Sequence, residues 1–260
     1  MPTPQHLLER LSAIATSLES TGNGLALLGL GSVGIERDRL DDFSDLDFFA
    51  IVRPGTKQNF LVKLDWLSAP CSISWCFMNT TDGYKALYSD GVFCEFAVFE
   101  PHELAGIPYS PGAVVWQAPD YSVPIAQPER PLPTPDNRPD AWHLGEALSN
   151  LYVGLCRWNR GEQLSAFRFV QSYAVDRYVT LFERRFPPQN PLLTDAFDAP
   201  RRLEARLPVL AEILPRLMPG YAHTPEAAMA MLAELERLSP TVCEWGVHTS
   251  ISREIRRLAG

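Results

Sequence analysis

The sequence contains few lysines, no surplus of positive charge and no long apolar run, and these absences exclude several classes of protein. Lys57, Lys63 and Lys85 are the only lysines among 260 residues, and the formal net charge is −8. A chain with this charge is poorly suited to neutralise a phosphate backbone, which argues against a nucleic-acid binder. No window approaches the roughly 18 apolar residues that span a bilayer, and the N-terminus lacks a basic region before an apolar stretch. We therefore expect a cytoplasmic protein with no nucleic-acid or membrane partner.

Cysteine patterns are absent as well. The five cysteines form no Cys-x-x-Cys pair, and their odd number does not suit a disulfide framework. We interpret them as small buried residues in a reducing compartment: Cys71, Cys76, Cys94, Cys156 and Cys243. An apolar fraction of 46% with 21% charged residues is typical of a soluble globular protein that buries a large core.

The first hundred residues alternate between strand and helix patterns. Apolar residues at helical spacing predict helices, and short apolar or alternating runs between glycine-rich or proline-rich turns predict strands. The expected helices cover residues 5–18, 31–40 and 56–67, and the expected strands cover 25–30, 45–52, 72–78, 84–88 and 92–99. We expect these elements to form one domain of strands and helices over residues 1–105, and the chain to be of the α+β class.

Residues 101–139 contain ten prolines, which indicates extended chain with room for one edge strand at 114–116. We predict a linker over 106–137. Beyond it, apolar residues recur at helical spacing over 142–160, 163–185, 201–217 and 224–238. The second domain, residues 138–260, is therefore expected to be an all-α helical bundle.

Two aspartates open the second expected strand. Asp45 and Asp47 are two residues apart, so on a strand their side chains point to one face. Asp47 lies among apolar residues, and no lysine or arginine occurs within three positions of it. A half-buried carboxylate costs several kcal/mol unless a positive charge compensates it. A bound metal ion is the candidate for that charge.

A third acidic residue stands alone in an apolar strand. Glu95 shares one face of the last hairpin strand with Phe93 and Ala97. It could instead be a surface residue on an edge strand, and Glu100 is its main rival as a functional carboxylate. Oxygen ligands with no histidine or cysteine nearby suit a hard cation such as Mg²⁺.

Gly31 and Ser32 follow the first strand directly. Backbone N–H groups and a hydroxyl at such a turn can bind a phosphate, although a serine there is also a common helix N-cap. A phosphate cradle beside a carboxylate metal site is what nucleotidyl transfer requires.

This pattern resembles the nucleotidyltransferase superfamily that includes the antibiotic nucleotidyltransferases and DNA polymerase beta. The motif of that family is Gly-Ser, a short helix, Asp-x-Asp, and a carboxylate on a later strand. Here it stands as Gly31-Ser32, Ser44-Asp45-Leu46-Asp47 and Glu95. A narrower resemblance, to the lincosamide nucleotidyltransferases, rests on CEFAVFEPHEL and on the helical segment LSNLYVGLCRWNRGEQLSAFRFVQSY.

The resemblance implies an enzyme that transfers a nucleoside monophosphate, expected to be AMP from ATP, to a hydroxyl of a small molecule such as a lincosamide or an aminoglycoside. It implies that Asp45, Asp47 and Glu95 hold two Mg²⁺ ions and are catalytic, with Glu95 either a metal ligand or the general base. Gly31, Ser32 and Ser44 would bind the nucleotide. The resemblance also implies that residues 1–105 are the catalytic domain, built on a mixed sheet flanked by helices, and that the protein is a homodimer.

Two alternatives stay open. The acceptor could be a protein hydroxyl, as in the antitoxin-type enzymes that adenylylate a helical partner. The chain could also be a catalytically idle nucleotide-binding or regulatory module that kept the fold.

Overall fold

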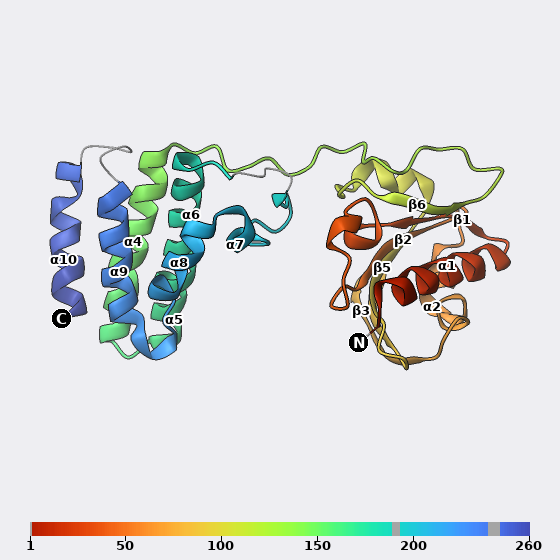
Figure 1. Cartoon of the computed structure of the whole chain (residues 1–260), viewed down its shortest axis with the longest axis horizontal. Coiled ribbons are helices and arrows are strands. Elements are labelled where there is room, and N and C mark those ends of the chain that lie inside the picture. The colour runs from red at the N-terminus through yellow and green to blue at the C-terminus, as the bar shows by residue number, and fades with distance from the viewer. Residues whose placement is uncertain (1, 189–192, 239–244) are drawn as a thin grey trace. The chain divides into compact units, whose positions relative to one another are not determined.

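The computed structural model describes residues 2–188, 193–238 and 245–260. The chain divides into two compact units, Met1–Pro133 and Thr134–Gly260, and each is described by itself (Figure 1). Cys243, interpreted above as a buried residue, lies outside the described residues. Within the described parts of the chain, no helix combines the length and apolar character needed to cross a membrane.

The first unit is built on a mixed six-stranded sheet, which gives the chain the α+β class predicted from its sequence. The sheet order is β3-β4-β5-β2-β1-β6, and β2 and β5 pair in parallel while the other neighbours are antiparallel. The strands are β1 Gly24–Gly29, β2 Leu46–Val52, β3 Ile73–Thr80, β4 Gly83–Tyr88, β5 Phe93–Phe99 and β6 Ala113–Gln117. β6 arises within the proline-rich segment and pairs with β1 at the sheet edge.

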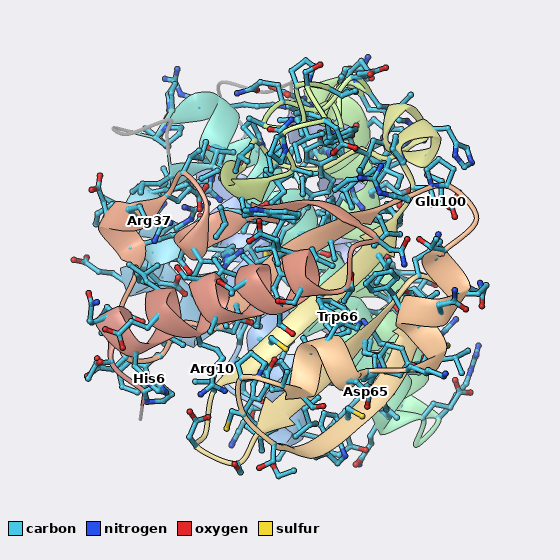
Figure 2. The ribbon with its side chains drawn as sticks, turned by 90° about the vertical axis from the view of Figure 1, so that its right-hand side faces the viewer. His6, Arg10, Arg37, Asp65, Trp66 and Glu100 are labelled. Carbon is cyan, nitrogen blue, oxygen red and sulfur yellow. The ribbon has the colours of Figure 1, made fainter. Side chains whose placement is uncertain are left out.

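One face of the sheet is covered by helices (Figure 1). They are α1 Pro4–Ser20, α2 Lys57–Val62 and α3 Asp65–Ser68. α1 starts where Thr3 caps it and Pro4 occupies its first turn, and its apolar stripe of Leu7, Leu11, Ile14 and Leu18 enters the core. His6 and Arg10 on α1 (Figure 2) contact the Asp90 carboxylate at 2.7 and 2.5 Å, which ties this helix to the β4–β5 turn.

The opposite face is covered only in part. The 3₁₀ segment Pro101–Gly106 and the chain that follows it pack over the β1 and β2 end of that face. Phe49 of β2 meets Phe99 and Tyr109 there, at ring-centroid distances of 4.9 and 5.5 Å. The rows of the same face toward β3 keep exposed or half-buried side chains.

Three expected elements of the first unit differ in the structure. Residues 31–40 form two 3₁₀ turns, Gly31–Val33 and Arg37–Arg39, and not one helix. Gly31 and Gly34 disfavour a helix here, because glycine loses more backbone conformational entropy than other residues when it becomes helical. The helix expected over 56–67 is divided between α2 and α3, since Lys63 adopts an extended conformation. β2 begins at Leu46, so Asp45 precedes the strand.

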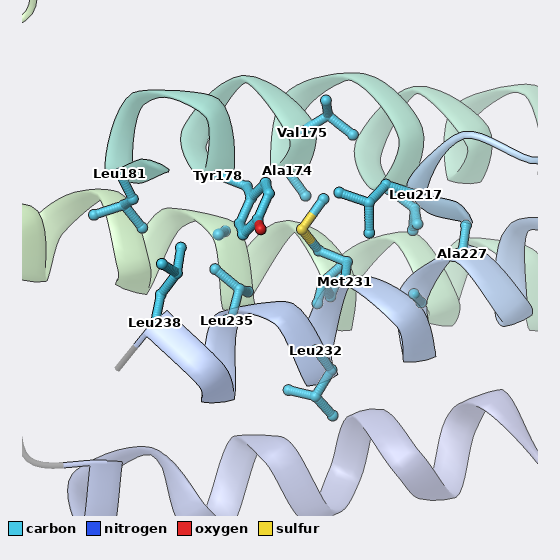
Figure 3. Close-up of a cluster of buried hydrophobic side chains, with 14 of the residues drawn as sticks. Ala174, Val175, Tyr178, Leu181, Leu217, Ala227, Met231, Leu232, Leu235 and Leu238 are labelled. Atoms are coloured by element: carbon cyan, nitrogen blue, oxygen red, sulfur yellow. The ribbon is translucent and has the colours of Figure 1, made fainter. Parts of the chain in front are cut away.

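The second unit is helical, as predicted, and α4 (Asp140–Asn159) contacts most of its helices. The others are α5 Gln163–Arg168, α6 Ala174–Arg185, α7 Leu203–Arg206, α8 Pro208–Leu217, α9 Thr224–Leu238 and α10 Thr249–Ala259. A close-up of their apolar core shows α6 residues such as Tyr178 and Leu181 facing Met231 and Leu235 of α9 (Figure 3).

Two helices of the second unit are interrupted where the sequence predicted continuous ones. A π turn at Phe169–Tyr173 separates α5 from α6. The helix expected over 201–217 is interrupted at Leu207, between α7 and α8, because a proline disfavours the helical conformation at the residue before it. α9 has the predicted bounds, whereas α10 was not predicted as a separate helix.

Candidate active site

The two principal carboxylates are brought together by the register of two interior strands. Asp47 of β2 pairs directly with Glu95 of β5 in the parallel ladder. Residues at paired positions share a face of the sheet, so these side chains neighbour each other although 48 positions separate them in the chain. β5 lies between β4 and β2, so the interpretation of Glu95 as an edge-strand residue is wrong. Both side chains are partly exposed on the open part of this face.

Asp45 and Ser44 lie in the loop that enters β2. Asp45 is half-buried. The Ser44 hydroxyl donates to Asp41 Oδ1 at 3.0 Å and accepts from the Asp41 N–H at 3.0 Å. Ser44 therefore stabilises the loop that delivers Asp45 to the strand.

The Gly31–Ser32 turn lies beside Asp47. The Leu30 N–H donates to the Asp47 carbonyl at 2.8 Å, which fixes the end of β1 against the start of β2. Gly31 has φ of +51°, a conformation that favours glycine. In the described part of the chain, neither the Gly31 nor the Ser32 N–H donates to a backbone carbonyl. Ser32 is buried, and the cap position of this turn belongs to Leu30.

An arginine that the sequence reasoning missed lies at the same turn. A Cβ atom on Gly31 would stand 2.7 Å from Arg39 Nη2 and 3.8 Å from Asp47 Oδ2. Arg39 also pairs through Nε with Glu36. Its guanidinium thus supplies positive charge near Asp47 from eight positions upstream, outside the three residues on either side of Asp47 that contain no lysine or arginine. The local clustering of Arg37 and Arg39 was the available signal.

Glu95 is held by two residues that the sequence reasoning also missed. Lys85 Nζ lies 3.0 Å from Glu95 Oε2, and Asn79 Nδ2 donates to Oε1 at 2.8 Å. Both carboxylate oxygens are therefore engaged. Glu100, the rival, accepts from the Gly55 N–H at 2.7 Å and closes a capping box with Glu103 at the 3₁₀ segment. That role is structural.

The site is electrically negative on the side of the core. Burial, together with the charges of Asp47 and Asp45, raises the pKa of the Cys94 thiol to about 12. The influence of both aspartates on one buried neighbour means that their charges act on the same short length of strand. A cation bound at this end of β2 would be favoured.

The donor set fits Mg²⁺ in its chemistry, since carboxylate oxygens are the ligands that this ion prefers. The geometry of these carboxylates is less complete than a metal site requires. Among the described residues, no three or more acidic, histidine or cysteine side chains gather closely enough to hold a metal ion.

Comparisons with known proteins add a structural similarity. No family model matches the chain, and no curated protein matches it. A crystal structure of an aminoglycoside 6-adenyltransferase from Bacillus subtilis is similar over 100% of this chain and 98% of that chain, at 12% sequence identity and a TM-score of 0.39. A similarity this distant assigns neither a family nor an activity.

Proposed function

We propose that this protein is a Mg²⁺-dependent nucleotidyltransferase that transfers a nucleoside monophosphate, AMP from ATP, to a hydroxyl group of a small molecule. The observation that carries the proposal is the direct pairing of Asp47 with Glu95 beside the Gly31–Ser32 turn. Asp47 and Glu95 are distant in the sequence and adjacent in the sheet, and the Gly31–Ser32 turn follows β1, the strand next to β2. They are the parts of the motif that resembles the nucleotidyltransferase superfamily.

Each part has a role in this proposal. Asp45 and Asp47 would hold Mg²⁺, which when bound neutralises charge on the triphosphate. The N–H groups of Gly31 and Ser32 would donate to phosphate oxygens, with Arg39 nearby as an additional cation. Glu95 would either complete the metal site or accept the proton of the acceptor hydroxyl.

In the proposed transfer, one phosphorus–oxygen bond forms and another breaks. The acceptor oxygen forms a bond to the α-phosphorus, and the bond from that phosphorus to the bridging oxygen of the β-phosphate breaks. Pyrophosphate leaves with the electron pair of that bond. The hydroxyl proton passes to a base, for which Glu95 is the candidate on the open face. The proposed acceptors are antibiotics such as lincosamides or aminoglycosides.

Mass spectrometry of reaction products tests the proposal. The full chain is incubated with Mg²⁺, mixed nucleoside triphosphates and a panel of lincosamides and aminoglycosides, with Asp47→Ala as the control. The expected result is a gain of one nucleoside monophosphate on an acceptor, absent with the variant. Absence of both product and Mg²⁺-dependent nucleotide binding would refute it.

One observation favours a second candidate, an idle nucleotide-binding module. Glu95 is paired with Lys85 and Asn79, and a carboxylate committed to such contacts is what a structural role requires. The two candidates differ in the product assay, because an idle module modifies no acceptor. Its nucleotide affinity would also be unchanged in Asp47→Ala, with and without Mg²⁺.

A further inference from the structure

A row of side chains crosses the open face of the sheet from the candidate carboxylates to an exposed aromatic pair. Asp47 pairs with Glu95, Glu95 pairs with Lys85, and Lys85 pairs with Phe77. Because paired residues share a face, all four side chains lie on the same side of the sheet. Trp75 is two positions before Phe77 on β3 and therefore shares that side.

The aromatic pair is exposed although it belongs to a folded strand. Trp75 and Phe77 keep 48% and 46% of their surface exposed, and their ring centroids lie 5.2 Å apart. Two large rings side by side on open sheet form an apolar surface of the kind that marks a binding site. Met78 alternates to the opposite face and is 49% exposed, which makes it a matched control.

The charges on these strands limit what can bind. The sequences of β3, β4 and β5 contain two charged residues, Lys85 and Glu95. Lys85 stands between the aromatic pair and the carboxylates, and Glu95 already carries the opposite charge to it. The charges of Lys85 and Glu95 offset each other, so these strands offer no spare carboxylate for a ligand with several ammonium groups.

The spacing of the strands sets the length of a fitting ligand. Phe77 and Glu95 are separated by two strand intervals, about 10 Å at about 4.8 Å per interval. A molecule of roughly two rings spans that distance. One end would reach the carboxylates, and the other would cover the aromatic pair.

We propose that Trp75 and Phe77 form the acceptor-binding surface and that the acceptor is a neutral or singly charged, two-ring molecule with an apolar ring face. This inference rests on the proposed nucleotidyl transfer and names its substrate class. The ring face stacks on the aromatic pair while the reacting hydroxyl lies near Glu95. The two aromatic residues determine specificity and do not take part in the chemistry.

The test compares two acceptor sets and three single variants in the full chain. Lincosamides, with one amine, and neutral aryl glycosides form the first set, and aminoglycosides, with several amines, form the second. With Mg²⁺ and ATP, transfer is expected on the first set. Trp75→Ala and Phe77→Ala should each raise the KM for the acceptor about tenfold and leave the KM for ATP within about twofold, as the loss of one stacking contact predicts. Met78→Ala should match the wild type.

Other outcomes separate this inference from the function on which it rests. Transfer that prefers aminoglycosides, or that is equally efficient in the aromatic variants and Met78→Ala, overturns the surface and leaves nucleotidyl transfer intact. Nucleotide binding without transfer to either set also overturns the named substrate class. Absence of Mg²⁺-dependent nucleotide binding refutes the proposed function itself. Thermal unfolding of each variant confirms that it is folded.

Discussion

The two units place their acidic residues in opposite settings. In the helical unit, Glu234 is buried and contacts Tyr178 Oη at 3.1 Å, Arg216 Nη2 at 3.2 Å and Arg237. In the sheet unit, Asp47 and Glu95 lie partly exposed at neighbouring strand positions next to a turn that has N–H groups to donate. Glu234 is surrounded by groups that satisfy it from within its own unit. Glu95 also has partners, Lys85 and Asn79, but Asp47 and Glu95 remain partly exposed on the sheet face, where a ligand could reach them.

The difference shows that a carboxylate among apolar residues can have either of two roles. One stabilises the fold through a closed set of partners, and the other concentrates charge at a surface at some cost in stability. Substitution should separate the two cases, because removing a structural carboxylate harms folding and removing a functional one harms activity.

The largest effects are expected when Asp47 of the sheet unit and Glu234 of the helical unit are each replaced by a neutral residue. Asp47→Asn should lower the transfer rate about 1000-fold, equivalent to about 4 kcal/mol, without lowering the melting temperature. Glu234→Ala should cost about 2 kcal/mol of unfolding free energy, because Tyr178 loses its buried partner, and should leave kcat within about twofold. Steady-state kinetics and chemical denaturation measure both. The comparison fails if Asp47→Asn unfolds the protein or Glu234→Ala abolishes transfer in folded enzyme.

Much of this comparison was accessible from the sequence. The alternation of polar and apolar residues around Glu95 predicted its face, and the isolation of Asp47 among apolar residues marked it as unusual. The parallel pairing of these two residues was not accessible, because local periodicity carries no information on which distant strands become neighbours. Asn79 and Arg39 were missed for the same reason, since each reaches the site through the fold. Glu234 sits on a helix whose other charged residues are ordinary surface residues, and no pattern distinguished it.

A second pair of substitutions tests how tightly the helical unit is packed. A Cβ on Gly154 of α4 would stand 2.6 Å from Val170 Cγ2, next to the π turn, whereas a Cβ on Gly145 of the same helix would meet nothing within 4 Å. Gly154→Ala should destabilise the unit by about 2 kcal/mol through overpacking. Gly145→Ala should stabilise it by about 0.5 kcal/mol through helix propensity. Denaturation midpoints report both, and equal shifts in one direction would contradict the packing described.

A third comparison stays within the sheet unit and separates backbone strain from loss of the Gly31–Ser32 turn, the proposed phosphate-binding site. Gly31→Ala forces a side chain into the left-handed region and against Arg39, 2.7 Å away. Nucleotide affinity should fall about tenfold, the equivalent of about 1.4 kcal/mol. Gly55 has φ of +80° with nothing within 4 Å of its Cβ position, so Gly55→Ala causes similar strain away from the turn. Calorimetric titration with ATP and Mg²⁺ should find Gly55→Ala near the wild type. Equal losses would mean that strain alone accounts for the effect.

The smallest effect is a pH dependence that belongs to the helical unit. Burial lowers the pKa of His143. The positive charges of Arg184, Arg177 and Arg138 lower this pKa further, whereas the negative charge of Asp136 raises it. The unfolded chain then binds more protons than the folded one below about pH 6.5, so stability is complete above that pH and falls as the pH decreases. We therefore expect the free energy of unfolding to fall as the pH is lowered from 7 to 5. His143→Phe should remove this part of the pH dependence in thermal unfolding, and an unchanged profile would exclude His143 as its source.

The most direct test of the central claim is a titration of the full chain with Mn²⁺, a spectroscopic substitute for Mg²⁺, in the presence of a non-hydrolysable ATP analogue. Electron paramagnetic resonance counts the free ion. We expect nucleotide-dependent Mn²⁺ binding to the wild type, and binding at least about tenfold weaker to Asp47→Asn. Mn²⁺ binding to Glu100→Gln should equal that of the wild type, because Glu100 caps a 3₁₀ segment. Equal Mn²⁺ binding by the wild type and Asp47→Asn would contradict the account, because the carboxylates paired across β2 and β5 would then not be the site of a metal ion.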